Sequence, residues 1–258
     1  MSDHSERGCI GIMEGRRAER RGPHTVKFDY SAIPVGYYDR IFHERKGAQS
    51  KWHHLKFNFF RACVANHTAH LDIGCGPGTF IGSLPAGFRS TGVDIAREQI
   101  DYAERRYGHP GRRFLQIGTG PLPFADNSFD VVTIIELVEH LTDEQNYHLL
   151  VEAHRVLASR GKLYISTPNY GSAWSLLERL VNHFGGVSYE NQHISRFRAS
   201  RLRAALVRAG FRKIRCHPYQ GIAFAAAALS WKLASLIDHL ERPMTRYWGF
   251  LLFAEGTK

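Results

Sequence analysis

The sequence has few cysteines, and no two of them are spaced to bind a metal together. The four cysteines, at positions 9, 63, 75 and 216, form no CxxC or CxxH pattern. Their arrangement argues against a structural zinc site and against a disulfide framework. The chain therefore suits a reducing compartment, and we expect it to be cytoplasmic.

Long apolar segments are also missing. The N-terminus lacks the apolar core of a signal peptide, and the longest mostly apolar stretch, 221–237, is short and contains Lys232.

Acidic residues are scarce as well. The chain has 24 aspartates and glutamates against 34 lysines and arginines, which gives a net charge of +10. This charge suits a polyanion, an anionic membrane surface or an acidic small molecule, although a basic solvated surface also explains it. We expect a soluble protein and leave peripheral membrane association open.

The 258 residues are 43% hydrophobic, which predicts one large domain with additions rather than two domains. Residues 1–23 lack apolar periodicity and are predicted to be a disordered basic tail. Residues 24–66 predict an N-terminal helical cap, and 67–258 predict the main domain. Within that domain, two segments belong to none of the predicted strands and are interpreted as insertions: residues 169–198 and residues 220–248. The first insertion is a candidate lid.

Short β-rich runs alternate with amphipathic helical stretches in the main domain. The predicted strands are 69–74, 90–95, 112–117, 129–135, 162–167, 211–219 and 249–256. This alternation is typical of βαβ units, so the fold class is α/β, with a mostly parallel seven-stranded sheet and helices on both faces.

The strongest motif is the glycine loop "LDIGCGPGTF" at 71–80. Its glycines, Gly74, Gly76 and Gly78, leave room for close approach of a ligand to a turn that opens a helix. Asp94 ends the next strand, where its carboxylate could accept hydrogen bonds from both hydroxyls of a ribose. Together these features predict a nucleoside-containing cofactor.

The loop does not have the GxGxxG spacing of dinucleotide-binding proteins, and it has an acid, Asp72, before the glycines. That acid could hold the cationic amino group of a methionine-like tail. With "PLPFADNSFDVVTIIELVEHL" further along, the chain resembles the class I S-adenosylmethionine-dependent methyltransferases over Ala69–Arg215. The resemblance implies a Rossmann-like sheet whose last strand is antiparallel.

The resemblance also assigns a cofactor site. It places Asp72 at the methionine moiety, Asp94 at the ribose and Ile95 against the adenine. One departure is Gly118, which stands where an aspartate commonly contacts the adenine amine, so adenine recognition falls to backbone groups, to Thr119 or to another part of the chain. The full set implied for S-adenosylmethionine is Asp72, Gly74, Cys75, Gly76, Gly78, Asp94, Ile95, Thr119 and Ile135.

The stretch "IIELVEHL" at 134–141 places Glu136, Glu139 and His140 where one helical turn could bring them together. Two carboxylates and an imidazole could hold Mg²⁺ or another divalent metal, and the mixed nitrogen and oxygen donors favour no single ion. Such an ion could lower the pKa of a substrate hydroxyl. The alternative is an acidic helix start whose carboxylates interact with the helix dipole.

The same E-x-x-E-H pattern occurs in two similar groups, the ubiquinone-biosynthesis O-methyltransferases and the small-RNA 3′-end 2′-O-methyltransferases. Both have a further histidine beyond the fifth strand, and His193 stands at about that place here. The resemblance therefore makes His193 a fourth candidate ligand. Without a metal, His140 or His193 is the candidate general base.

Apolar residues in both insertions favour a hydrophobic or lipid-linked small-molecule acceptor, methylated on a hydroxyl oxygen. One alternative is an RNA 2′-O-methyltransferase, for which the arginine-rich stretch 196–215 could bind phosphates. No aromatic residues are interleaved with those arginines, which makes nucleic acid the weaker candidate partner. The other alternative is a cofactor-binding protein without turnover, because Gly118 replaces a common contact.

Overall fold

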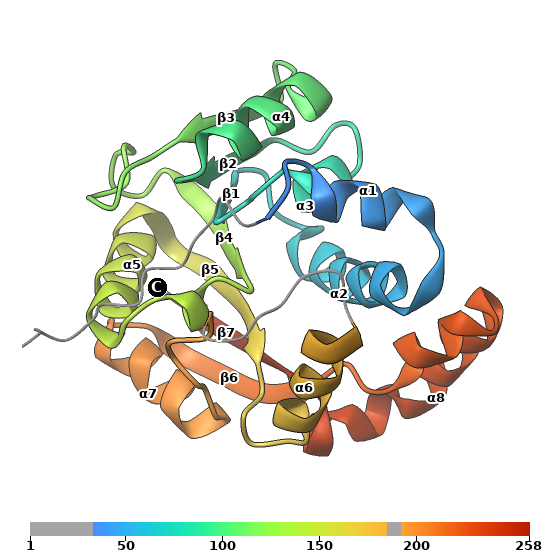
Figure 1. Ribbon diagram of the computed structural model, residues 1–258. Coiled ribbons are helices and arrows are strands. Elements are labelled where there is room, and N and C mark those ends of the chain that lie inside the picture. The colour runs from blue at the N-terminus through green and yellow to red at the C-terminus, as the bar shows by residue number, and fades with distance from the viewer. Residues whose placement is uncertain (1–32, 185–191) are drawn as a thin grey trace, which may run out of the picture.

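Seven strands form one sheet at the centre of the protein (Figure 1). The computed structural model describes residues 33–184 and 192–258. The strand order is β3-β2-β1-β4-β5-β7-β6, in which β7 pairs antiparallel with both neighbours and the other pairs are parallel. The strands are β1 (His70–Ile73), β2 (Ser90–Asp94), β3 (Arg112–Gln116), β4 (Phe129–Ile135), β5 (Leu157–Pro168), β6 (Arg212–Tyr219) and β7 (Leu251–Thr257). The predicted fold class is confirmed.

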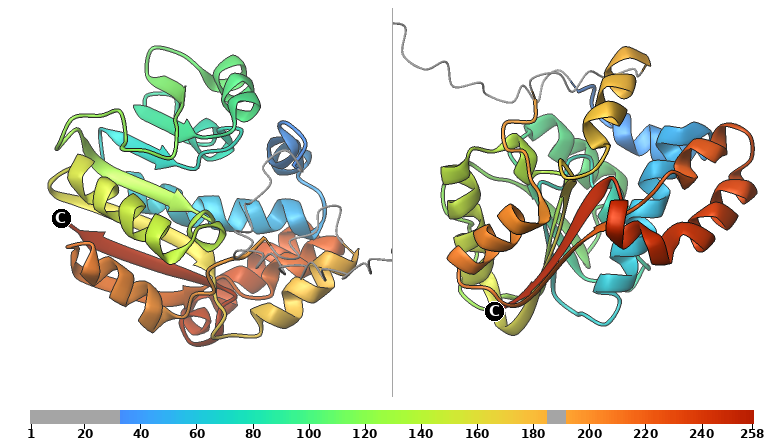
Figure 2. Two further views of the ribbon diagram at one scale, coloured as in Figure 1. Left: turned by 60° about the vertical axis from the view of Figure 1, so that its left-hand side comes forward. Right: turned by 90° about the horizontal axis from the view of Figure 1, so that it is seen from below.

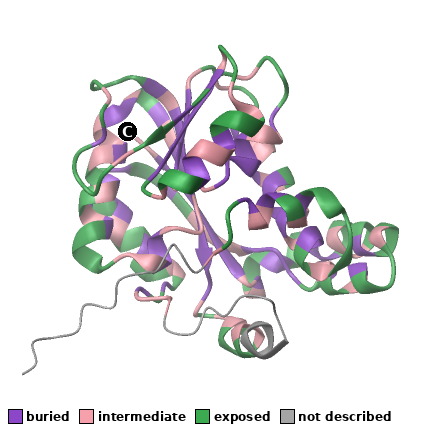
Figure 3. Cartoon of the chain, turned by 45° about the horizontal axis from the view of Figure 1, so that its top comes forward, coloured by how far each residue is buried: buried purple, intermediate pink, exposed green. Residues whose placement is uncertain are grey.

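Helices cover both faces of the sheet (Figure 2). On one face α5 and α7 pack against a core that includes Leu150 and Leu206, and on the other face lie α2 and α8. Buried residues are concentrated in the strands and on the inward sides of the helices (Figure 3). The helices are α1 (Tyr37–Glu44), α2 (Gly47–Val64), α3 (Thr79–Gly82), α4 (Arg97–Tyr107), α5 (Asp143–Val156), α6 (Trp174–Phe184), α7 (Ala199–Arg208) and α8 (Trp231–Trp248), with 3₁₀ turns η2 (Val138–His140) and η3 (Ala223–Ala228).

The strand boundaries agree with the prediction to within a few residues, except at β5. The predicted strand begins at residue 162, but β5 already begins at Leu157. Leu157 pairs with Phe129, and the regular register with β4 then resumes at Lys162. The irregularity coincides with Arg160, whose φ of 66° is unusual for a residue with a side chain.

The predicted N-terminal cap contains α1 and α2. Asp39 of α1 is buried and accepts hydrogen bonds from the hydroxyls of Tyr102 and Tyr107 on α4, which fixes α1 beside the main domain. The predicted tail, 1–23, lies outside the described residues. None of the helices in the described part of the chain is long and apolar enough to cross a membrane.

Candidate active site

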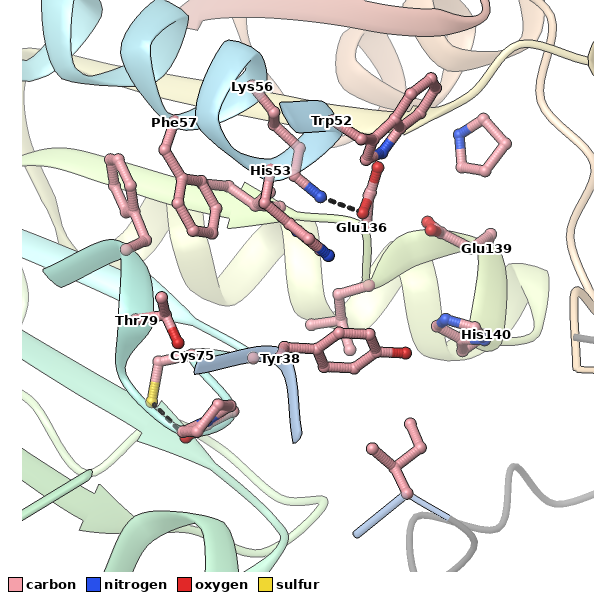
Figure 4. A pocket seen from close by; sticks show the side chains of 18 of the residues that line it. Tyr38, Trp52, His53, Lys56, Phe57, Cys75, Thr79, Glu136, Glu139 and His140 are labelled. Atoms are coloured by element: carbon pink, nitrogen blue, oxygen red, sulfur yellow. Dashed lines mark hydrogen bonds and ion pairs between the residues drawn. The ribbon is translucent and has the colours of Figure 1, made fainter. Parts of the chain in front are cut away.

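One cavity of about 520 Å³ opens beyond the carboxyl ends of β1, β2 and β4. Its volume is in the range of small-molecule sites. One side, here called the glycine-loop wall, consists of the loop after β1 together with Asp94. The opposite side, the aromatic wall, consists of Trp52, Trp174, Leu177 and Phe224 with the pair Glu178–His193. Figure 4 shows part of both walls.

The glycines of the glycine-loop wall have different roles. Gly76 has a φ of 51°, and a Cβ added there would meet no atom within 4 Å, so the backbone is open to a ligand. Gly78 differs: a Cβ there would lie 2.7 Å from the Phe114 ring and 2.9 Å from Ala103. Gly78 therefore allows the turn to pack on α4 and β3, and it does not line the cavity.

Two buried carboxylates face this wall. The Oδ2 atom of Asp94 accepts a hydrogen bond from the Gly76 N–H (2.8 Å), and Oδ1 accepts one from the Ala96 N–H (2.9 Å). Burial raises the pKa of Asp94, and it raises the pKa of Asp72 to about 7. A buried carboxylate is costly without a partner, so Asp72 is suited to a cationic ligand.

A chain of buried hydrogen bonds holds Asp72 from beneath. The Thr133 hydroxyl donates to Asp72 Oδ1 at 2.6 Å, and His70 Nε2 lies 2.8 Å from that hydroxyl oxygen. The Thr133 hydroxyl already donates its one proton to Asp72, so its oxygen can only accept, and Nε2 of His70 is the donor to it. The other ring nitrogen, Nδ1, then accepts a hydrogen bond from the Ser90 hydroxyl at 3.0 Å. His70 is therefore a core histidine with a partner for each ring nitrogen.

Glu136 departs from the expected convergence on one helical turn. It follows β4 with a φ of 53°, and its carboxylate pairs with Lys56 of α2 (Figure 4). Only Val138–His140 forms a turn of 3₁₀ helix, so Glu136 lies outside the turn that carries Glu139 and His140. The Lys56 side chain is 3% exposed, which makes this a largely buried ion pair.

Glu139, His140 and His193 do converge. Each offers one ligand atom, and these atoms lie within 4.8 Å of one another. The chain returning from the first insertion is held at η2 by the Ser195 N–H, which donates to the Glu139 carbonyl at 2.9 Å. Thr167 donates to the Glu139 carboxylate at 2.9 Å, and burial raises the pKa of Glu139 to about 7.

The two imidazoles have different surroundings. His140 Nδ1 lies 3.0 Å from the Gln192 carbonyl, and burial lowers the pKa of His140 to about 4. His193 Nδ1 lies 2.5 Å from Glu178 Oε1 and 2.8 Å from the Tyr170 hydroxyl. The Glu178 carboxylate and the Tyr170 hydroxyl therefore fix the orientation of the His193 ring through Nδ1.

The aromatic wall contains residues that sequence reasoning did not select. Glu178 was not singled out because no local motif marks a carboxylate that orients a histidine fifteen positions away. Trp52 lies 5.8 Å from Trp174 and 4.8 Å from Phe224, measured between ring centroids. Tyr38, His53 and Gln99 also line the cavity, and the only signal for the first two was the density of aromatics and histidines before residue 66.

Most predicted cofactor residues line the cavity. Those that do are Asp72, Gly74, Cys75, Gly76, Asp94 and Ile135. Ile95 and Thr119 are exposed and, like Gly78, are not part of the lining. Ile95 lies one residue after Asp94, where the chain turns outward into α4, and Thr119 lies in an exposed loop after β3.

Comparison with known proteins gives a family match for the central part of the chain. Residues 71–165 match the family model described as a methyltransferase domain. A probable S-adenosylmethionine-dependent methyltransferase of Mycobacterium tuberculosis (strain ATCC 25618 / H37Rv) is 30% identical over 142 residues, which cover 55% of this chain and 47% of that protein. A ubiquinone biosynthesis O-methyltransferase of Idiomarina loihiensis is 31% identical over 116 residues, covering 41% and 47%.

Solved structures agree on the fold. A SAM-dependent methyltransferase from Thermotoga maritima, a possible histamine N-methyltransferase, superposes with a TM-score of 0.60 at 22% identity, covering 86% of this chain and 94% of that one. The chain spans between 30% and 48% of the length of the first curated relatives it matches. Residues 71–165 therefore match a methyltransferase domain, and the chain has the Rossmann-like fold of these solved structures; the domain match implies S-adenosylmethionine as the methyl donor.

Proposed function

We propose that the protein transfers the methyl group of S-adenosylmethionine to a hydroxyl oxygen of a hydrophobic or lipid-linked small molecule. The observation that carries the proposal is a single cavity with a glycine loop and two buried carboxylates on one side and an aromatic wall on the other. One relative with this domain is, by name, an O-methyltransferase. The more specific likeness to ubiquinone-biosynthesis enzymes stays a prediction.

The glycine-loop wall fits S-adenosylmethionine. Gly76 offers open backbone, and the Asp94 carboxylate has lone pairs beyond those that accept its two backbone N–H groups, so it can receive the ribose hydroxyls. Asp72 suits the ammonium group of the methionine part. The Thr79 hydroxyl lines the same wall and is buried without a hydrogen-bond partner among the described residues, so it can serve a ligand.

The aromatic wall favours an apolar acceptor. Its side chains offer large hydrophobic faces, and the cation that lines the cavity beside them, Lys56, is already paired with Glu136. Glu139 and Glu178 would repel a phosphate there. The cavity therefore gives little support to the RNA alternative, and a lipid-like acceptor would bring the protein into peripheral contact with a membrane.

Catalysis would rest first on holding the acceptor hydroxyl in line with the sulfonium methyl group. The acceptor oxygen forms the new bond to the methyl carbon as the carbon–sulfur bond breaks, and the hydroxyl proton needs a base. His193 is the better of the two candidate bases, because the Glu178 carboxylate orients its ring, as the acid of a catalytic triad does. His140, with its pKa lowered to about 4, is the weaker one.

A divalent metal is a second candidate for the same task, favoured by the convergence of Glu139, His140 and His193. Each histidine directs Nδ1 to an oxygen acceptor, the Gln192 carbonyl or Glu178, as metal-bound histidines usually do. These three residues would hold the ion, which would lower the pKa of the acceptor hydroxyl. Glu136 would be excluded by its pairing with Lys56.

The test is transfer of labelled methyl from S-adenosylmethionine to a panel of extracted lipids, phenols and RNA, with and without thorough chelation. We expect label in phenols or lipid hydroxyls. Activity that survives chelation supports His193 as the base, whereas activity lost on chelation and restored by one metal supports the ion. The alternative of cofactor binding without turnover predicts calorimetric binding of S-adenosylmethionine but no labelled product. An absence of binding would refute all of these functions.

A further inference from the structure

Helix α8 exposes a continuous apolar stripe. Leu229 just before the helix is 86% exposed and Leu240 is 63% exposed. The stripe repeats every three or four residues, which places its members along one side of the helix. Its members are Leu229, Leu233, Leu236, Leu240, Met244 and Tyr247.

The stripe is not explained by a loosely packed helix, because the opposite side of α8 is fixed. Ala234 is fully buried, and Lys51 of α2 donates to the Trp231 carbonyl and to the Ser235 hydroxyl. Glu241 is buried and accepts hydrogen bonds from the N–H groups of Ile222 and Ala223, both at 3.0 Å. The stripe is therefore exposed on a helix that lies at the edge of the protein (Figure 1).

A basic line runs beside the stripe. Three of its members recur every seven residues, which aligns them along the helix, and a fourth lies on the same side. The basic line consists of Lys232, His239, Arg246 and Arg242. All four are exposed, whereas Glu241 is buried and Asp238 is partly buried and paired with Arg242 at 2.5 Å. The exposed half of α8 thus combines leucines with positive charge and exposes no acid.

We infer that α8 lies in the interfacial layer of an anionic phospholipid membrane. The apolar stripe would enter the acyl boundary, and the basic line would contact the lipid phosphates. A second copy of the chain is a poorer occupant, because a twofold interface would set α8 against α8, and α8 exposes no acid to meet the basic line. The inference goes beyond methyl transfer, since membrane binding is measurable without cofactor or acceptor.

The test is flotation of the full chain with phosphatidylcholine vesicles, with or without phosphatidylglycerol. We expect binding to the anionic vesicles, and we expect L236E/L240E to weaken it by about a hundredfold. The variant K232Q/R246Q should weaken binding to anionic vesicles by about thirtyfold while leaving any binding to neutral vesicles unchanged. The matched control V151E/V207E adds the same charge on α5 and α7, over the other face of the sheet, and should float like the parent chain.

Two results would overturn the inference. The first is equal flotation of the parent chain and L236E/L240E, which would mean that α8 does not contact the vesicle. The second is no flotation at all, together with dimers in light scattering that L236E/L240E converts to monomers, which would assign the stripe to an interface between copies. Circular dichroism of each variant checks that the fold is retained, which we expect because every changed side chain is exposed.

Discussion

The glycine-loop wall comes mostly from one short stretch of chain, whereas the aromatic wall combines side chains from α2, α6, η3 and the segment after residue 191. In the first wall, local backbone geometry places the groups, because glycines with positive φ bring the Gly76 N–H to Asp94. In the second, tertiary packing places them, as when the Ser195 N–H bonds to Glu139 and brings His193 to the cavity. A motif in the sequence therefore reveals the methyl donor more readily than the acceptor.

The largest expected effect comes from the aromatic wall. Replacing His193 by glutamine should lower kcat by about a thousandfold, because the base that receives the hydroxyl proton is lost. Glu178→Gln should lower kcat less, since His193 remains but loses the carboxylate that orients it. Single-turnover rates measure both effects, and calorimetry should find S-adenosylmethionine affinity unchanged. A kcat within about twofold of the parent for H193Q would remove His193 from the mechanism.

The glycine-loop wall can be blocked by one substitution. Gly76→Val should weaken S-adenosylmethionine binding by at least about a hundredfold, because the side chain would occupy space beside the ligand. The positive φ at Gly76 should cost only about 1–2 kcal/mol of unfolding free energy. Gly120→Val, the same change at an exposed glycine with open space, is the control for calorimetry and thermal unfolding. Normal cofactor affinity in G76V would place the donor elsewhere.

The buried chain under Asp72 should make stability depend on pH. Burial lowers the pKa of His70 to about 3 from 6.5, so the folded protein binds fewer protons than the unfolded chain between these values. Unfolding free energy should therefore fall as the pH drops below 6.5, and His70 should contribute about 2 kcal/mol of that loss by pH 5. Denaturant titrations at pH 7.5 and 5 should show that H70Q loses less stability on acidification. An identical loss in both chains would contradict the assigned neutral His70.

The smallest expected effect is at the ribose. Asp94→Asn should weaken S-adenosylmethionine binding by about tenfold, because the amide has only one acceptor oxygen in place of the two that accept the Gly76 and Ala96 N–H groups, and that oxygen is a weaker acceptor than a carboxylate. Asp101→Asn, at a half-exposed carboxylate of α4 that pairs with Arg97, is the control. Calorimetry compares the two variants. Equal affinities would mean that the sequence motif misplaced the ribose contact.

The sequence was sufficient to predict the sheet and most of the glycine-loop wall. The strands show regular alternation with helices, and the turn from Asp72 to Thr79 depends on residues close in sequence. Ile95 and Thr119 are the exceptions, since both are exposed outside the cavity lining. Their assignment came from the family alone, and whether they contact a bound cofactor stays a prediction.

The aromatic wall could not be assembled from sequence. A helical pattern indicates that α2 has an apolar face but not which side chains meet the cavity, so Trp52 and the pairing of Lys56 with Glu136 were not predicted. The spacing of Glu136 from Glu139 and His140 suggested one helical turn. Glu136 instead has a positive φ directly after β4, and residue spacing does not predict that backbone conformation. The approach of His193 to Glu139 and His140 was expected from resemblance, whereas its partner Glu178 was not.

The most direct test of the central claim is product analysis by mass spectrometry after incubation with S-adenosylmethionine carrying a deuterated methyl group and a membrane lipid extract. We expect a labelled methoxy group in a lipid-soluble product, formed by the parent chain and not by G76V. Label found only in added RNA, or attached to nitrogen or carbon, would contradict methylation of a hydrophobic hydroxyl.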